Sequence, residues 1–155
     1  MINARAETVA EKSAFRDAFR RSRCLVIADG FYEWKRDGKA RRPVYVRLKS
    51  CEPFGMAGIY SLWHSPDGED ICTCAIITTD ANELLRPVHD RMPVIIPKEL
   101  EDIWLNPRMA DNELVMSILT PFSADLMECY EVSGVINRAD FDKPEAIEPL
   151  SVDNI

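Results

Sequence analysis

The sequence predicts a single α+β domain built mostly of β-strands, and three observations support this prediction. Short apolar or alternating segments fill the middle of the chain, turn signals such as Asp37-Gly38 and Pro66-Asp67-Gly68 separate them, and helical periodicity recurs only at intervals. Strands joined by hairpin-length turns are typical of antiparallel sheets rather than of alternating βαβ units. A length of 155 residues is enough for one domain with its own core.

The expected strands share apolar runs or strict alternation of apolar and polar residues. They cover residues 24–28, 31–34, 44–48, 54–63, 70–79, 92–96 and 130–133. Because Asp37-Gly38 is a hairpin signal, the strands on either side of it are expected to pair with each other.

Helices are expected at the edges of this strand-rich region. The first covers residues 7–22, where Thr8 and Glu11 have the spacing of a capping box. Two further helices are expected at residues 98–105 and 110–119. Asp80 is a candidate cap for a short helix that ends before Pro87, and the polar tail from Asn137 is expected to be irregular.

Composition limits the classes of function. The net charge of −7 argues against broad nucleic-acid binding, so any DNA contact must come from a local basic cleft. No apolar run approaches the roughly 20 residues that span a bilayer, and the first residues do not form a signal peptide, so a cytoplasmic monomer without membrane contact is expected.

The five cysteines do not have the spacing of a metal site. Only Cys72 and Cys74 lie close together, and the two histidines, His64 and His89, do not complete a ligand set. The cysteines are therefore expected to be reduced, mostly buried thiols, and neither a metal nor another cofactor is expected.

Three groups of polar residues are candidates for chemistry. Glu33 lies among aromatic residues, which would raise the pKa of its carboxyl and suit it to proton transfer, unless the side chain points into water. His89 lies between a helix and a strand, where it is either an acid–base group beside Asp90 or a loop histidine bonded to the backbone. Asn3 and Arg5 suit oxyanion and phosphate contacts, or else belong to a solvated terminus.

Four separated motifs occur together in this chain. They are Asn3-Ala-Arg5-x-Glu7-Thr8, Arg23-Cys-Leu-Val-x-Ala-Asp-Gly-Phe-Tyr-Glu-Trp34, His89-Asp-Arg-Met-Pro93 and Val132-Ser-Gly-Val-Ile-Asn137. Their order and spacing, over nearly the whole chain, resemble the SRAP (SOS response-associated peptidase) family. The resemblance implies a distorted antiparallel β-barrel or sheet with peripheral helices.

The resemblance also implies a function and a site. The family senses abasic sites in single-stranded DNA during the DNA damage (SOS) response, with peptidase and lyase-type chemistry. By position, the implied catalytic residues are Asn3, Glu33 and His89, and the implied DNA-binding residues are Arg5, Thr78 and Arg91. Glu33 would move protons as the sugar opens, and His89 would protonate the ring oxygen of the sugar.

The family's terminal cysteine is the part of its pattern that this sequence departs from. That cysteine forms a thiazolidine crosslink with the abasic sugar and is linked to autoproteolytic removal of a leader, but none of the five cysteines here follows Met1. We therefore expect a single SRAP domain, residues 1–155, that lacks the family's N-terminal segment and strand or strands and is inactive in crosslinking by itself. The alternatives are a module that binds single-stranded DNA without a covalent bond, and an inactive remnant.

Overall fold

The computed structural model describes residues 1–38, 40–109 and 112–150. It divides into two compact units, each assembled from three segments of the chain. Unit 1 consists of Met1–Ala28, Phe54–Asp80 and Arg91–Phe122, and unit 2 of Asp29–Pro53, Ala81–Asp90 and Ser123–Ile155. Each unit is described by itself below, and the expected single domain stays a prediction.

Unit 1 contains a six-stranded sheet, in which four strands follow the order β1-β6-β5-β2 and two short strands pair beside them. The main strands are β1 (Asn3–Arg5), β2 (Arg23–Ala28), β5 (Phe54–His64) and β6 (Asp70–Asp80). β7 (Arg91–Pro93) pairs with β6, and β8 (Ile95–Ile96) pairs with β5. All these pairs are antiparallel except β1–β6, which is parallel.

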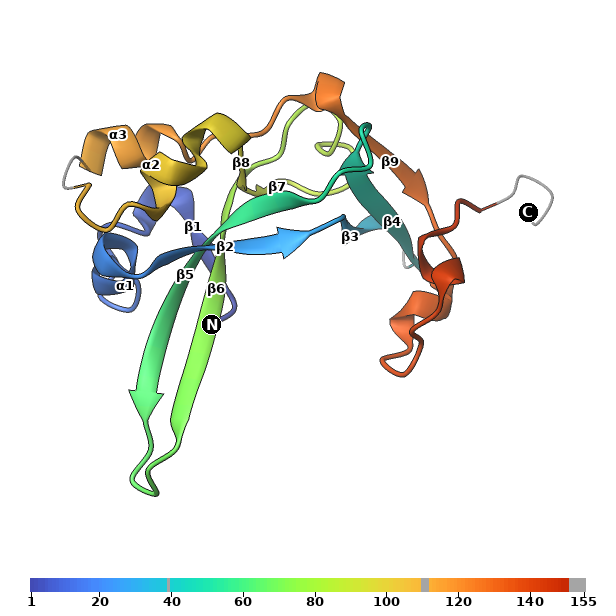
Figure 1. Cartoon of the computed structure of the whole chain (residues 1–155). Helices are drawn as coiled ribbons and strands as arrows, with labels where there is room; N and C mark the ends of the chain where they lie inside the picture. The colour runs from blue at the N-terminus through green and yellow to red at the C-terminus, as the bar shows by residue number, and fades with distance from the viewer. Residues whose placement is uncertain (39, 110–111, 151–155) are drawn as a thin grey trace. The chain divides into compact units, whose positions relative to one another are not determined.

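The helices of unit 1 lie together at one end of its sheet, and the long β5–β6 hairpin extends away from them (Figure 1). They are α1 (Arg16–Arg21), α2 (Glu101–Leu105) and α3 (Asn112–Ser117), with 3-10 turns η1 (Ala6–Thr8) and η2 (Lys98–Leu100). Phe19 of α1 and Trp104 of α2 are fully buried, with ring centroids 6.1 Å apart. Together with Ile59 and Ile77 from the sheet, they form the centre of this core.

Unit 2 contains a three-stranded antiparallel sheet with the order β3-β4-β9. Its strands are β3 (Phe31–Asp37), β4 (Ala40–Leu48) and β9 (Met127–Glu131). Three tyrosine rings, one from each strand, lie in a row, with centroids 5.2 Å apart for Tyr32 and Tyr45 and 5.9 Å apart for Tyr45 and Tyr130. The short turns η3 (Ala124–Leu126), η4 (Gly134–Asn137) and η5 (Pro144–Ile147) complete the unit.

Two tyrosines of this sheet hold residues 146–147 against it through hydrogen bonds. The hydroxyl of Tyr32 donates to the carbonyl of Ala146, and that of Tyr130 donates to the carbonyl of Ile147. An isolated bridge joins Val132 to Pro149. The tail that the sequence led us to expect as irregular therefore contains short turns packed onto β3 and β9.

The fold class is confirmed: the chain is mostly β, with few helices and two multi-stranded sheets, neither of which closes into a barrel among the described residues. The expected strands are found with bounds that differ by up to four residues, except that the strand expected at 92–96 is divided into β7 and β8. The Asp37-Gly38 hairpin is present, with Gly38 at φ +59°. A positive φ of this kind favours glycine, which explains the turn signal. The helix expected at 98–105 is found as η2 followed by α2.

Three local predictions are wrong. The helix expected over residues 7–22 is limited to η1 and α1, and the Thr8 hydroxyl, far from capping a helix, is buried with no hydrogen-bond partner among the described residues. The described residues 81–90, which follow Asp80 at the end of β6, form turns and no helix. The cysteines are not mostly buried, because Cys51, Cys72 and Cys74 are exposed and Cys24 and Cys129 are half-buried.

The last expected helix, 110–119, is found as α3, and residues 110 and 111 lie outside the described residues. Across the described ranges, no group of three or more His, Cys, Asp or Glu side chains is placed to hold a metal ion. No helix in the described part of the chain is both long and apolar enough to cross a membrane.

Candidate functional site

The candidate acid–base residues of unit 2 lie on β3 and on the loop of residues 81–90. Glu33 is on β3, opposite Val44 of β4, and its side chain is half-buried. Burial raises the pKa of the Glu33 carboxyl above its ordinary value of 4.5, and the charge of Asp90 raises it further. The positive charge of His89 and the backbone N–H of Trp34 act in the opposite direction, because both stabilise the carboxylate.

His89 is held by a loop that closes on itself. The backbone N–H of Ala81 donates to the carbonyl of Asp90 at 3.0 Å, and the backbone N–H of His89 donates to the carbonyl of Leu85 at 2.9 Å. Inside the loop, the buried side chain of Asn82 accepts a hydrogen bond from the backbone N–H of Leu85. These backbone and Asn82 contacts fix the position of His89 in the loop.

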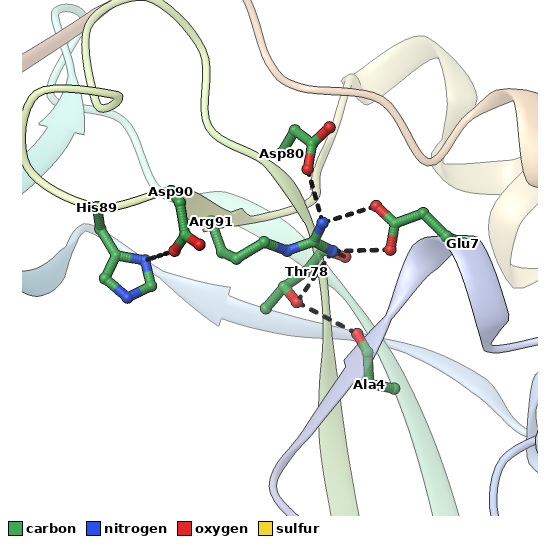
Figure 2. Close-up of polar contacts among 7 residues, drawn as sticks. All are labelled: Ala4, Glu7, Thr78, Asp80, His89, Asp90 and Arg91. Atoms are coloured by element: carbon green, nitrogen blue, oxygen red, sulfur yellow. Dashed lines mark hydrogen bonds and ion pairs between the residues drawn. The ribbon is translucent and has the colours of Figure 1, made fainter.

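The imidazole of His89 faces a carboxylate and borders a cavity. Its Nδ1 lies 3.3 Å from Oδ1 of Asp90, and the two groups face each other in Figure 2. The cavity has a volume of about 290 Å³ and is lined by Arg36, Arg86, Pro87, Val88, His89 and Asp90. Unit 2 thus combines a carboxyl of raised pKa, a histidine and two arginines.

The candidate DNA-binding residues lie in unit 1, around the guanidinium of Arg91. This group donates to both carboxylate oxygens of Glu7, at 2.7 and 3.0 Å, and to Asp80 at 2.8 Å (Figure 2). It also donates to the carbonyl of Thr78 at 2.6 Å, while the Thr78 hydroxyl donates to the carbonyl of Ala4. The side chain of Arg91 is 16% exposed, so this network joins η1, β6 and β7 in a partly buried setting.

Asn3 and Arg5 stand on one face of β1. They pair with Ile76 and Thr78 of β6, and the alternation of the strand buries Ala4 between them while both polar side chains are exposed. The terminus is therefore ordered by strand pairing and not frayed. Asn3 belongs to unit 1, and Glu33 and His89 belong to unit 2.

Sequence reasoning missed several residues of these groups. Glu7 and Asp80 are partners of Arg91, and Arg36 and Arg86 line the cavity beside His89. The pairing of Arg91 with Asp80 is a direct cross-strand pair between β7 and β6, which knowledge of the strand register would have revealed. A phosphate that reaches Arg91 has to compete with the carboxylates of Glu7 and Asp80. The expected role of Arg91 in DNA binding stays a prediction.

The Arg91 network predicts a loss of stability when the guanidinium is removed. Arg91→Met should lower the free energy of unfolding by about 1–3 kcal/mol at neutral pH, because charged hydrogen bonds in a partly buried site are lost. The bond from Arg91 lowers the pKa of Glu7, so its contribution is present above the ordinary pKa of a glutamate and is lost as pH falls through the lowered value. Urea unfolding at neutral and acid pH checks this, and an equal difference at both pH values would contradict it.

Comparison with known proteins identifies the family of this chain. Residues 1–139 match the sequence profile of the family described as SOS response associated peptidase (SRAP). The abasic site processing protein YoqW of Bacillus subtilis is 49% identical over 149 residues, which cover 96% of this chain and 66% of YoqW. The abasic site processing protein HMCES of Gallus gallus is 29% identical over 171 residues, covering 97% of this chain and 50% of HMCES.

Two solved structures have a fold similar to that of this chain. An X-ray structure of a protein from Bacteroides thetaiotaomicron has a TM-score of 0.89 and 36% identity, covering 96% of this chain and 66% of that protein. An X-ray structure of a protein from Bordetella bronchiseptica has a TM-score of 0.76 and 28% identity, covering 84% of this chain and 64% of that protein. The chain spans about half to two-thirds of the length of these relatives. The four sequence motifs, the fold and the match to the family profile all agree. The chain therefore belongs to the SRAP family.

Proposed function

We propose that this chain acts on abasic sites in single-stranded DNA, and that Glu33 and His89 exchange protons with the exposed deoxyribose. The observation that carries the proposal is the electrostatic pairing of these residues in unit 2, where burial raises the pKa of Glu33 and the charge of His89 opposes that rise. A carboxyl whose pKa is raised by burial holds and releases a proton more readily within the working pH range of an acid–base catalyst than an exposed carboxyl does. The names of the relatives, abasic site processing proteins, point to the same substrate.

The proposed step is the opening of the closed sugar. The abasic deoxyribose is a hemiacetal, and the Glu33 carboxylate removes the proton of its C1′ hydroxyl. The bond between C1′ and O4′ breaks, O4′ takes a proton from the imidazolium of His89, and C1′ becomes an aldehyde. One proton leaves the sugar and one enters it, so the step balances and needs no cofactor.

The fuller chemistry implied by the family resemblance uses this aldehyde. It condenses with the amine and thiol of a terminal cysteine to form a thiazolidine and release one water molecule. We propose that the pair on β3 and the 81–90 loop prepares the aldehyde for that capture. In unit 1, Asn3 would orient the sugar through its amide, and Arg5, Thr78 and Arg91 would contact the DNA backbone.

Trapping of the open sugar tests the proposal without requiring the crosslink. O-benzylhydroxylamine forms an oxime only with the aldehyde, so the rate of oxime formation on an abasic single-stranded oligonucleotide reports ring opening. The chain should accelerate this rate, and Glu145→Gln should accelerate it equally, because Glu145 is an exposed residue of η5. If the chain only binds single strands, as the alternative function requires, it will bind abasic and intact oligonucleotides alike and leave the trapping rate unchanged.

A further inference from the structure

Positive charge is concentrated at the end of the β3–β4 hairpin, although the chain as a whole has a net charge of −7. The hairpin carries Lys35 and Arg36 on β3 and Arg41 and Arg42 on β4. Arg42 lies 3.5 Å from a carboxylate oxygen of Glu131. Among the side chains that the structure describes, no carboxylate forms an ion pair with Lys35, Arg36 or Arg41. We call these four residues the basic ribbon.

The strand register makes the charges of the basic ribbon oppose each other. Lys35 pairs with Arg42, and Arg36 pairs with Arg41, so each cation lies directly opposite another cation. Like charges in such cross-strand positions destabilise a sheet. In the described residues, β9 pairs with Val44–Leu48 of β4, so the two pairs of opposed cations lie beyond the part of the hairpin that β9 covers.

Protection of a free sheet edge does not account for this arrangement. Charged residues on an edge strand prevent unwanted pairing, but a carboxylate opposite each cation would protect the edge as well and would stabilise the hairpin. Two like pairs in succession therefore carry a cost in stability. A bound polyanion would remove the repulsion and offset this cost.

The basic ribbon is continuous with the cavity of the candidate site, within the same unit. Arg36 lines that cavity together with Arg86 and His89. One residue pair back along the hairpin, Trp34 is 36% exposed, and its indole N–H donates to the side-chain oxygen of Asn137 at 2.9 Å. Since successive side chains alternate between the two faces of a strand, Trp34 shares a face with Arg36.

A fixed aromatic ring beside a run of cations is the combination that binds single-stranded nucleic acid without regard to sequence. We propose that the basic ribbon binds the sugar–phosphate backbone of the strand next to the lesion, with Arg36 and Arg86 leading it to the His89 cavity and Trp34 stacking on a base. The inference rests on the proposed function only in taking DNA as the polyanion.

Salt-dependent binding of an intact oligonucleotide tests the inference. The probe is a fluorescent single-stranded oligothymidylate without abasic sites, and the variant is Lys35→Gln/Arg36→Gln/Arg41→Gln. Arg36 and Arg41 share a face with Trp34, and the loss of their two phosphate contacts should lower the slope of log K against log salt by about 1.4 and the affinity at low salt by about 10-fold or more. Arg42 is kept because of its contact with Glu131.

A matched control has the same change in net charge. Arg16→Gln/Arg20→Gln/Arg21→Gln removes three exposed cations from α1 in unit 1, and it should keep the salt slope of the unchanged chain. Lys35→Arg/Arg41→Lys preserves the charge and should also keep the slope. The ribbon variant should unfold at a higher urea concentration than the unchanged chain, since the like-charge pairs are gone.

Equal slopes for the ribbon variant and the α1 control would overturn the inference. So would binding of phosphatidylserine vesicles that depends on the ribbon, if the slope for DNA is unaffected. The proposed function is judged separately by aldehyde trapping. Loss of trapping in Glu33→Gln supports the proposed function, whereas normal trapping in Glu33→Gln contradicts the proposed function and leaves the comparison of salt slopes unaffected.

Discussion

Glu33→Gln should slow the protein-dependent trapping of the abasic aldehyde by about 100-fold or more, the usual contribution of a general acid or base. Glutamine has nearly the shape of glutamate and keeps a hydrogen-bonding oxygen, but it does not exchange a proton. The half-buried position on β3 is therefore preserved while the chemistry is lost. Oxime formation on an abasic oligonucleotide measures the effect, with Glu145→Gln as the matched control.

The same change should not destabilise the fold at neutral pH. Because burial raises the pKa of Glu33 in the folded chain, the folded state binds more protons than the unfolded state just above pH 4.5. The contribution of Glu33 to stability is therefore fully present below that value and is lost as pH rises through the raised pKa. Glu33→Gln removes this loss, so urea unfolding above the raised pKa should show equal or greater stability than in the unchanged chain.

A stability loss as large as the loss of activity would mean that Glu33 has a structural role. In that case, slower trapping would follow from unfolding, and the assignment to proton transfer would fail. A trapping rate equal to that of Glu145→Gln in a folded protein would equally remove Glu33 from the chemistry.

Arg23→Leu should lower the free energy of unfolding by about 3–5 kcal/mol, the range found when one partner of a buried charged interaction is removed. Arg23 is only 8% exposed, and its guanidinium donates to the carbonyls of Trp104 at 2.7 Å and Phe19 at 2.8 Å, as well as to those of Arg20 and Asn106. It thereby joins β2 to the C-terminal ends of α1 and α2. Leucine fills part of the space but leaves these carbonyls without a donor.

Urea unfolding of Arg23→Leu, Arg23→Lys and the exposed control Arg21→Leu checks this prediction. Lysine keeps the charge but not the planar arrangement of donors, so Arg23→Lys should still lose a large part of the stability. Arg21→Leu should change the free energy of unfolding by less than about 0.5 kcal/mol, as is usual for an exposed position. Similar values for Arg23→Leu and Arg21→Leu would show that the carbonyl contacts contribute little.

The strands were predictable because their signals are local. Alternation from Val44 to Leu48 and the Asp37-Gly38 turn determine the β3–β4 hairpin without reference to the rest of the chain. The first helix was predicted too long for a physical reason. Phe15 and Phe19 have helical spacing and are buried, but Val9 reaches the same core from a turn, which a periodicity argument does not distinguish from a helix.

The candidate site was predictable only in part. The raised pKa of Glu33 follows from its apolar surroundings, which the sequence indicates, whereas its proximity to His89 is tertiary and follows only from the family motifs. The partners of Arg91 could not be read from the sequence, because Glu7 is 84 residues away and Asp80 was expected to cap a helix. The opposed cations of the basic ribbon could have been predicted from the sequence, because the turn at Gly38 sets the register of β3 and β4. The prediction only needs the residue pairs to be counted outward from Gly38.

The most direct test of the account is a double-mutant cycle on the rate of aldehyde trapping, with the unchanged chain, Glu33→Gln, His89→Gln and the double variant. If the carboxyl and the imidazole serve one proton-transfer step, the double variant should be no more than about a few-fold slower than the slower single variant, because residues that act as a unit are strongly non-additive. Effects that multiply, or single variants as fast as the unchanged chain, would contradict the assignment of a joint role to Glu33 and His89.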